Sequence, residues 1–271
     1  MRYKIGEVSR ILGLSSQMIR YYEKCGVINS ERVGDGSYRN FSDLDILLLF
    51  QAIKYKEWGI NIKEIDELVS RDYFNTLYHE LDVFERELSE KIKSESLLLK
   101  RVEEIRKQIV SCKYNIGSYW FDYSPAYYLY RMGKAVNDDY DFTILDPEMS
   151  EQIYDGCNIC YFDPFVEYDG DTGYWWFAIE KKYHDALQIT DAGDYKVVEE
   201  HLCLQSCIDM GEIGSFRKSQ LLPFTTYARE KGYEPEDSLM GLLVGVGSEK
   251  NQFSRILKIQ LPSSAFSCNS R

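Results

Sequence analysis

The spacing of apolar residues divides the chain into an N-terminal helical part, one long helix and a C-terminal part rich in strands. Apolar side chains recur at a helical spacing over Ile5–Leu12, and Gly13 then favours a left-handed turn. Ser15 or Ser16 is placed to cap a second helix that runs to Lys24. The pattern therefore predicts two short helices joined by a tight turn.

A hairpin and two further helices are predicted next. Gly34-Asp35-Gly36 is a strong turn signal between short flanks within Asn29–Phe41, which indicates a β-hairpin. Helix caps at the first residue of each segment predict helices over Ser42–Lys56 and Asn61–Ser70. The first 70 residues thus have the pattern of a helix-turn-helix with a β-hairpin wing.

From Leu77 onward the apolar residues follow the alternating four- and three-residue spacing of a coiled coil. No proline or glycine occurs between Ser70 and Ile116, so we expect one long helix. Pairing with a second copy would cover its apolar stripe, and packing onto the C-terminal part is the alternative. The predicted dimer interface, in which Lys91 and Glu95 are the two polar positions, is Leu77, Leu81, Phe84, Leu88, Lys91, Glu95, Leu98, Val102, Ile105 and Ile109.

The two polar positions predict the direction of pairing. In an antiparallel pair centred on the run from Leu77 to Ile109, Lys91 of one chain faces Glu95 of the other. A parallel pair would place like charges opposite each other. The alternative is that both side chains reach solvent and Ile92 takes their place in the seam. We therefore expect an antiparallel coiled coil.

Beyond Ile116 the chain consists of aromatic, strand-like segments and turn residues. Two helical stretches, Met149–Tyr154 and Ser215–Lys231, interrupt them. Strand, helix, strand, strand then occurs twice, which predicts an α+β domain of two similar halves. We place the domains at residues 1–75, 76–115 and 121–271. The predicted strands are Tyr127–Arg131, Ile159–Phe162, Tyr174–Glu180, Tyr195–Cys207, Leu239–Val246 and Ile256–Leu261.

Charge separates the same regions. Residues 121–271 hold 13 basic and 25 acidic residues and carry the whole net charge of −12, whereas residues 1–40 hold 7 basic and 4 acidic residues. The N-terminal part therefore suits phosphate, and the C-terminal part suits a cationic partner. No apolar run approaches the roughly 20 residues that span a bilayer, and we see no secretory signal, so we expect a cytoplasmic protein without a membrane partner. Seven cysteines, an odd number, argue against a disulfide framework.

Several short motifs resemble the MerR family of transcriptional regulators. They are Ile5-Gly6-Glu7-Val8, Ser15, Ile19-Arg20-Tyr21-Tyr22-Glu23, Gly26-Val27-Ile28, Tyr38-Arg39 and Phe41. The resemblance covers about residues 1–75 and implies a winged helix-turn-helix joined to an antiparallel dimerisation helix. It also implies a homodimeric activator that binds double-stranded promoter DNA and distorts it when an effector is bound, so that RNA polymerase holoenzyme engages both promoter elements.

The C-terminal half is similar to the gyrase-inhibitory-protein-like (GyrI-like) effector domain of multidrug-sensing members of that family. This likeness implies a sensor of lipophilic, cationic small molecules. The chain departs from the family pattern at Met18-Ile19 and Asn29-Ser30, and the strand glutamate common in the effector domain is missing from Ser238–Val244. The similar segments are Ile159–Pro164, Tyr174–Glu180 and Lys231–Pro235.

Exposed positions of the second helix, the wing and the fourth helix form the candidate DNA-binding set. Their side chains are of the types that contact base edges and phosphates. The alternative is that Arg20 and Tyr21 belong to an ordinary solvated helix face. The set consists of Ser16, Gln17, Arg20, Tyr21, Tyr38, Arg39 and Lys63.

Aromatic residues and one carboxylate form the candidate ligand-binding set. Tyr174, Trp176, Ala178 and Glu180 share one face of a predicted strand. Aromatic walls attract a lipophilic cation through their ring faces, and a desolvated carboxylate supplies its counter-charge. Ordinary core packing is the alternative for each aromatic residue. The set consists of Tyr127, Tyr130, Tyr154, Tyr161, Tyr174, Trp176 and Glu180.

Two other classes of function are the alternatives. Cys157-x-x-Cys160 and Cys203-x3-Cys207 offer four thiolates to a metal or redox site, with Cys112 near the end of the long helix. A strand, however, sets residues i and i+4 about 13 Å apart. A small-molecule hydrolase is the other alternative, but the three histidines, His79, His184 and His201, form no recognised catalytic motif. We therefore expect that the protein holds no metal ion, needs no cofactor and is not an enzyme.

Overall fold

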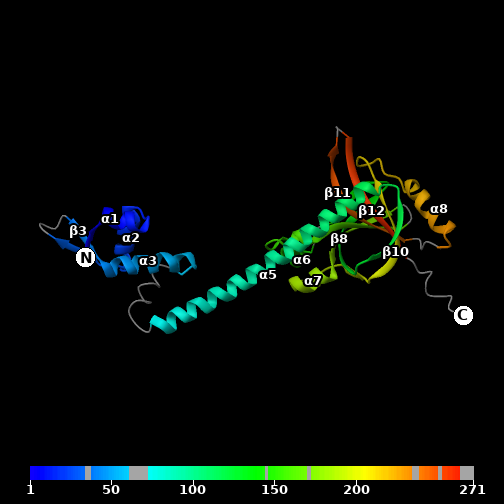
Figure 1. Cartoon of the computed structure of the whole chain (residues 1–271). Coiled ribbons are helices and arrows are strands. Elements are labelled where there is room, and N and C mark those ends of the chain that lie inside the picture. Colours follow the sequence, from blue (N-terminus) through cyan, green and yellow to red (C-terminus); the bar gives the residue numbers. More distant parts are fainter. Residues whose placement is uncertain are drawn as a thin grey trace. The chain divides into compact units, whose positions relative to one another are not determined.

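The structure is a computed structural model, and it describes residues 1–33, 38–60, 73–143, 146–169, 172–233, 238–249 and 252–262. The chain divides into two compact units, Met1–Ser96 and Leu97–Arg271. The boundary lies within the long helix α5 (Tyr73–Tyr114), which contributes residues to both units (Figure 1). The one long helix expected between Ser70 and Ile116 is confirmed, whereas the predicted domain boundaries stay a prediction.

The described part of the N-terminal unit contains short helices and a three-stranded antiparallel sheet of order β1-β3-β2. The two predicted short helices, the hairpin strands and the helix after Ser42 are confirmed. The predicted turn Gly34-Asp35-Gly36 and the predicted helix Asn61–Ser70 lie outside the described residues. The elements are β1 (Arg2–Lys4), α1 (Ile5–Leu12), α2 (Ser16–Lys24), β2 (Glu31–Val33), β3 (Tyr38–Ser42) and α3 (Asp43–Glu57).

Local hydrogen bonds explain where these helices begin and end. The Ser15 hydroxyl accepts a hydrogen bond from the Met18 backbone N–H (3.1 Å), so Ser15 caps α2. Gly13 ends α1 in the left-handed conformation, with a φ of 67°. Ser42 and Asp45 form a capping box at the start of α3. The core that these helices cover includes Val8, Ile19, Tyr22, Phe41, Leu49 and Ala52.

The described strands of the C-terminal unit form one large antiparallel sheet in the order β4-β10-β12-β11-β7-β8-β5-β6, and β9 pairs with β5. Three α-helices and two short 3-10 helices connect them. The elements after α5 are β4 (Tyr119–Ser124), β5 (Tyr127–Val136), β6 (Asp139–Phe142), α6 (Pro147–Tyr154), the 3-10 helix Asn158–Tyr161, β7 (Phe162–Asp169), β8 (Thr172–Glu180), α7 (Lys181–Leu187), β9 (Tyr195–Val198), β10 (His201–Asp209), the 3-10 helix Lys218–Leu221, α8 (Leu222–Glu230), β11 (Ser238–Glu249) and β12 (Gln252–Pro262).

Strand, helix, strand, strand occurs twice in this unit, as β5-α6-β7-β8 and as β10-α8-β11-β12. In each half the last strand lies between the other two, and β7 pairs with β11 to join the halves. This is the order predicted from the sequence. The pairing of β7 with β11 at the centre joins the two halves into one continuous sheet.

One predicted strand is wrong. Ile159–Phe162 was expected to be extended, but Asn158–Tyr161 is a 3-10 helix and β7 begins only at Phe162. The Tyr161 ring packs on the Tyr183 ring of α7, with 5.0 Å between centroids. Burial of this aromatic pair outweighs the strand preference of a short apolar run.

Other predicted elements differ in extent; the strand expected over Tyr127–Arg131, for example, continues to Val136 as β5. The single strand expected over Tyr195–Cys207 is two strands, because β9 pairs with β5 while β10 pairs with β4 and β12. The residues between them, Glu199-Glu200, lie outside either strand. The helix expected from Ser215 starts as an α-helix only at Leu222, where Pro223 in the first turn suits a helix start.

The two faces of the sheet carry different clusters. Helices α6 and α7 pack on one face of the sheet through a group of buried residues that we name the helix-side cluster. Helix α8 packs further along the same face through a separate buried cluster. The other face carries what we name the Trp176 cluster: Tyr127, Leu129, Phe165, Trp176, Ala178 and Leu242. The helix-side cluster consists of Tyr130, Met149, Ile153, Tyr161, Phe162, Ile179, Tyr183 and Ile189.

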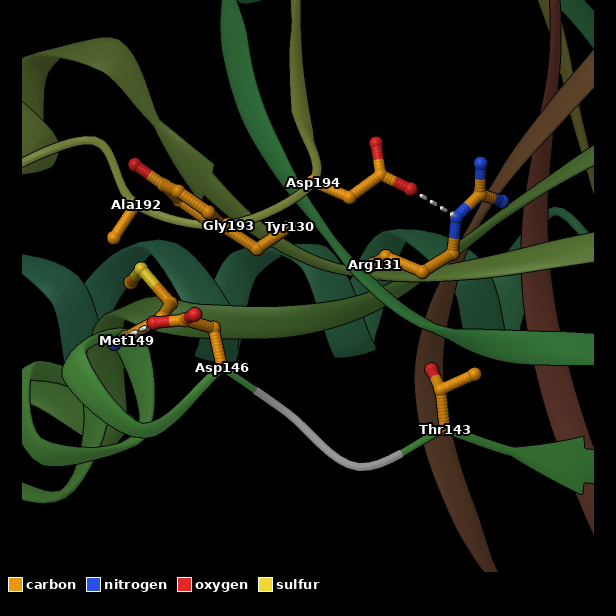
Figure 2. Close-up of a pocket in the computed structure, with 8 residues that line it drawn as sticks. All are labelled: Tyr130, Arg131, Thr143, Asp146, Met149, Ala192, Gly193 and Asp194. Atoms are coloured by element: carbon orange, nitrogen blue, oxygen red, sulfur yellow. Dashed lines mark hydrogen bonds and ion pairs between the residues drawn. The ribbon is translucent and has the colours of Figure 1, made fainter.

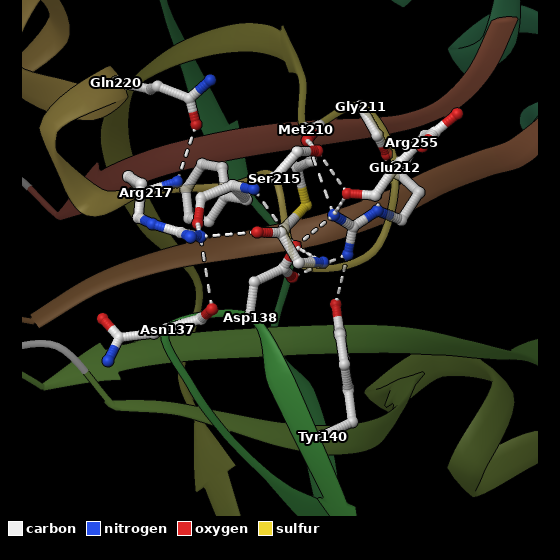
Figure 3. A network of polar contacts seen from close by, with 12 residues as sticks. Asn137, Asp138, Tyr140, Met210, Gly211, Glu212, Ser215, Arg217, Gln220 and Arg255 are labelled. Carbon is white, nitrogen blue, oxygen red and sulfur yellow. Dashed lines mark hydrogen bonds and ion pairs between the residues drawn. The ribbon is translucent and has the colours of Figure 1, made fainter.

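A buried ion pair ties the β5–β6 turn to β12 (Figure 3). The Arg255 guanidinium donates from Nη1 to Asp138 Oδ1 (2.7 Å) and from Nη2 to Asp138 Oδ2 (2.5 Å). Tyr140 Oη and the carbonyl of Glu212 also accept from Arg255. The backbone N–H of Gly214 donates to Asp138. Both charges are therefore desolvated but well partnered, a geometry that costs little while both partners are present.

We predict that Arg255→Met lowers the free energy of unfolding by about 3–5 kcal/mol, because it leaves the Asp138 carboxylate buried without its counter-charge. Urea unfolding at neutral pH measures the loss. The matched control is Arg217→Met, since Arg217 is exposed and, among the described residues, its guanidinium donates to backbone carbonyls and pairs with no carboxylate. If Arg255→Met lowers the free energy of unfolding no more than Arg217→Met does, the buried ion pair of Arg255 with Asp138 does not stabilise the fold as proposed.

The same pair predicts a pH dependence. Burial alone would raise the pKa of Asp138, but hydrogen bonds from Arg255, Phe216 and Gly214 outweigh it and hold that pKa below its usual value. A carboxyl with a lowered folded-state pKa stabilises the fold above its unfolded pKa, and this stability is lost as the pH falls through the folded value. Asp138→Asn should therefore reduce the dependence of stability on pH below about pH 4.

Candidate functional site

A basic depression lies on the surface of the N-terminal unit. Its volume is about 500 Å³. Four of its lining side chains are cationic and one is acidic, so it carries net positive charge. Clefts lined by one sign of charge concentrate counter-ions, and Lys and Arg neutralise nucleic-acid phosphates. The depression is the candidate nucleic-acid interface, lined by Lys4, Ile5, Gly6, Glu7, Arg10, Arg20 and Arg39.

Helix α2 presents three of the predicted DNA-binding residues to solvent. Gln17, Arg20 and Tyr21 are exposed, whereas Tyr22 on the inner side is buried. Ser16 is half-buried at the first position of the helix. Arg20 forms no hydrogen bond or ion pair with any residue that the structure describes. Its charge is therefore available to an external anion.

Arg39 is held in place on the wing strand β3. Its Nε donates to Glu23 Oε2 (2.8 Å), and the same carboxylate accepts a hydrogen bond from Ser30 Oγ. Glu23 thus fixes the position of Arg39 relative to α2. The side chain of Tyr38 and the whole of Lys63 lie outside the described residues.

Sequence reasoning missed Lys4 and Arg10, which line the same depression. Lys4 is the N-cap residue of α1, and Arg10 lies in its last turn. The excess of basic residues within positions 1–40 was the available signal. Only the fold of α1 beside α2 and β3 places these two residues beside Arg20.

The residues predicted to bind a ligand lie in several environments, so the structure does not gather them around one cavity. Burial raises the pKa of Tyr127 well above its usual value, as expected for a core phenol. Ligand binding by this set stays a prediction. Tyr127 and Trp176 belong to the Trp176 cluster with Tyr174 at its edge, Tyr130 and Tyr161 belong to the helix-side cluster, and Tyr154 is exposed.

The Trp176 ring is already in contact with two cations of the chain. Arg131 Cζ lies 3.8 Å from the ring centroid, and Lys196 Nζ lies 4.9 Å from it. Arg131 is also paired with Asp194 and Lys196 with Glu167. This face of the sheet therefore combines the aromatic rings and carboxylates that hold a cation, and two cations of the chain itself already occupy them.

Glu180, the predicted counter-charge, is also paired. Its carboxylate lies 2.7 Å from Lys182 Nζ and 3.8 Å from Arg101 Nη1. Arg101 comes from α5 and forms a second ion pair with Asp163. Sequence reasoning missed Arg101 and Asp163, because a charged residue on a heptad helix is normally exposed.

A cavity of about 350 Å³ opens beside β5 (Figure 2). Of the predicted ligand residues, only Tyr130 lines it. The Tyr130 hydroxyl is bonded to Asp191 Oδ1 (2.9 Å) and lies 3.1 Å from His184 Nε2. The cavity is lined by Tyr130, Arg131, Thr143, Asp146, Met149, Ala192, Gly193 and Asp194.

The cysteines considered for a metal site are divided between two environments. Cys157 and Cys160 are exposed, whereas Cys203 and Cys207 are buried on β10. Burial raises the pKa of the Cys203 thiol. Within the described ranges, no group of three or more His, Cys, Asp and Glu residues is arranged to hold a metal ion. No helix there is both long and apolar enough to cross a membrane.

Comparisons with known proteins place these features in a family. The sequence profile of the MerR HTH family regulatory proteins matches residues 3–72. The HTH-type transcriptional regulator HmrR of Rhizobium leguminosarum bv. viciae is 35% identical over 98 residues, which cover 32% of this chain and 75% of that protein. The chain therefore belongs to the MerR family of helix-turn-helix regulatory proteins.

Other relatives match over shorter stretches. Heavy metal-dependent transcription regulator 2 of Rhizobium meliloti (strain 1021) is 38% identical over 66 residues, 24% of this chain and 45% of that protein. The HTH-type transcriptional activator mta of Bacillus subtilis (strain 168) is 31% identical over 75 residues, 28% of this chain and 29% of that protein. The chain thus spans less than half of the length of these two relatives.

Proposed function

We propose that this protein is a homodimeric, sequence-specific DNA-binding transcription activator that responds to a small molecule. The basic depression around Arg20 carries this proposal, because it offers an unpaired cation on an exposed helix beside a fixed wing arginine. Membership of the MerR family supports it. The partners are double-stranded promoter DNA and RNA polymerase holoenzyme, and the bound dimer distorts the promoter so that the polymerase engages it.

The dimer forms through α5 in this proposal. An apolar stripe along the helix is exposed in the single chain: Leu88, Ile92, Leu99, Val102 and Ile109 are each about half exposed or more. Their spacing is that of a coiled coil, so a second copy of α5 covers them. Antiparallel pairing is proposed on the resemblance to the MerR family, since the pairing of Lys91 with Glu95 requires Lys91 in the seam.

The exposed stripe differs from the predicted seam at several positions. Leu77 packs against the N-terminal core, and Leu98 packs against the helix-side cluster. Lys91 and Ile92 are both exposed in the single chain, and covering the apolar Ile92 side chain is more favourable than covering the charge of Lys91. Ile92 is therefore the better residue for the seam. Glu95 remains on the exposed stripe. The seam proposed here therefore contains Ile92 and Leu99 in place of Lys91 and Leu98.

We propose a GyrI-like effector domain for residues 121–271, and a lipophilic cation as its ligand. Met240 and Leu242 of β11 lie at or beside the Trp176 cluster, so the stretch that lacks the usual glutamate is apolar there. In this proposal the carboxylates on β7 and β8, Asp163, Glu167 and Glu180, take the role of that glutamate, and a ligand competes with Arg101 and Lys196, which are already paired with them. Aromatic rings nearby add about 0.5–2 kcal/mol each to the binding of a cation.

The DNA-binding proposal predicts that Arg20→Ala weakens binding about tenfold at moderate salt, through loss of a phosphate or base contact. The duplex is selected from a random library by the wild-type protein, and fluorescence anisotropy measures affinity. Arg86→Ala on α5 is the control, since Arg86 is exposed and pairs with Asp82. Affinity within about twofold of wild type, or a flat response to salt, would show that the interface is wrong.

The ligand proposal predicts that phenyltrimethylammonium binds at least about tenfold more tightly than its neutral isostere tert-butylbenzene. Both molecules have the same shape, so the difference reports the charge. Isothermal titration calorimetry measures both. Equal affinities for the two molecules would contradict a cation-selective site.

The dimer proposal predicts that Leu99→Glu makes the protein monomeric, because it places an unpaired charge in an apolar seam. Light scattering after size-exclusion chromatography measures the mass. Lys107→Glu is the matched control, as it introduces the same side chain at an exposed polar position of α5. A dimer that survives Leu99→Glu would exclude this stripe as the interface.

A further inference from the structure

Arg101 is the largest of the fully buried side chains in the described part of the chain, with 2% of its surface exposed. It reaches from α5 into a polar site on the C-terminal unit. Its Nη2 is paired with Asp163 Oδ2, its Nη1 lies 3.8 Å from Glu180 Oε1, and its Nε donates to the carbonyl of Cys160 (3.3 Å). Its guanidinium also lies 5.7 Å from the centroid of the Tyr183 ring.

The groups around this guanidinium form a receptor for a planar cation. Asp163 on β7 pairs in register with Ala178 of β8, so Glu180, two residues further along β8, is its diagonal neighbour on the same face of the sheet. Glu180 is also paired with Lys182 Nζ (2.7 Å), which stays in place when Arg101 leaves. A carbonyl supplies a third acceptor and Tyr183 supplies an aromatic wall. Carboxylates and a carbonyl around an aromatic ring match the donors of a guanidinium or amidinium group. The Arg101 side chain that occupies this site is therefore itself an example of the planar cation that the site fits.

We propose that Arg101 is a built-in competitor, and that a small aromatic amidinium or guanidinium compound displaces it from Asp163 and Glu180. This inference rests on the proposed function, in which the C-terminal unit binds a cation. It adds the class of cation, the two carboxylates that bind it and the residue that the cation must displace.

Displacement of Arg101 changes the attachment of α5 to the C-terminal unit. The next turn of α5 is held by Glu104, which accepts hydrogen bonds from Lys182 Nζ and from the Tyr183 hydroxyl. Tyr183 therefore contacts both Arg101 and Glu104. A ligand that takes the place of Arg101 removes the innermost of these contacts, and α5 is the helix that continues into the N-terminal unit.

Competition makes a specific prediction about affinity. In the wild-type protein a cation binds only to the fraction of molecules in which Arg101 has left the site, so the apparent affinity is reduced by that fraction. Arg101→Met removes the competing charge and keeps an apolar side chain of similar length. We expect Arg101→Met to bind benzamidine at least about tenfold more tightly than wild type.

The experiment measures benzamidine and its neutral isostere benzamide by calorimetry with the full chain. Arg106→Met is the matched control, since Arg106 is exposed five residues further along α5, and its affinity should stay within about twofold of wild type. Benzamide should bind weakly to every variant. Equal affinities of Arg101→Met and wild type for benzamidine, or binding of benzamidine to neither, would overturn the proposal.

A second measurement covers the case in which Arg101→Met does not fold. In wild-type protein labelled with nitrogen-15, we expect the Arg101 Nε–H to give a protected side-chain signal, because it is buried and donates to the backbone carbonyl of Cys160. Benzamidine should increase the solvent exchange of that proton. A signal that stays protected at saturating benzamidine would contradict displacement. DNA binding of the ligand-free wild type is measured in parallel. Failure to bind DNA would contradict the proposed function, whereas failure of benzamidine to displace Arg101 would contradict the Arg101 proposal alone.

Discussion

The ion pair between Arg101 of α5 and Asp163 of β7 is the buried charged contact that links the long helix to the sheet of the C-terminal unit. A buried guanidinium is costly to desolvate, and the cost is offset only while acceptors surround it. Asp163, Glu180 and the Cys160 carbonyl provide them. Burial raises the pKa of Asp163, and the Arg101 charge opposes that shift. The helix is thus attached to the sheet by a buried polar contact, and our proposal is that a cation of the same shape replaces it.

The two units use charge in opposite ways. In the N-terminal unit Arg20 lies exposed and makes no ion pair within the described residues, and a depression gathers it with three other cations. In the C-terminal unit the buried cations Arg101 and Arg255 are each held by a carboxylate. Free positive charge on one unit suits an external polyanion, whereas satisfied positive charge within an acidic sheet suits exchange with a cationic ligand. One helix, α5, belongs to both units.

Sequence patterns predicted those parts of the fold that local physics determines. The caps Ser15 and Ser42 and the turn residue Gly13 act within a few residues, so the short helices were predictable. The 3-10 helix at Asn158–Tyr161 was not, because the contact of Tyr161 with Tyr183 decides it. Alternation along β8 predicted which residues share a face, but not which face the helices cover. Burial of Arg101 depends on strands far away in sequence, and no local pattern reveals it.

A double-mutant cycle on Arg101 and Asp163 tests the central contact most directly. Urea unfolding of the wild type, Arg101→Met, Asp163→Asn and the double variant gives the coupling free energy between the two side chains. We expect a coupling of about 2 kcal/mol or more, since each single change leaves the other buried group without its partner. A coupling below about 0.5 kcal/mol would mean that the pair does not hold α5 to the sheet, and would contradict this account.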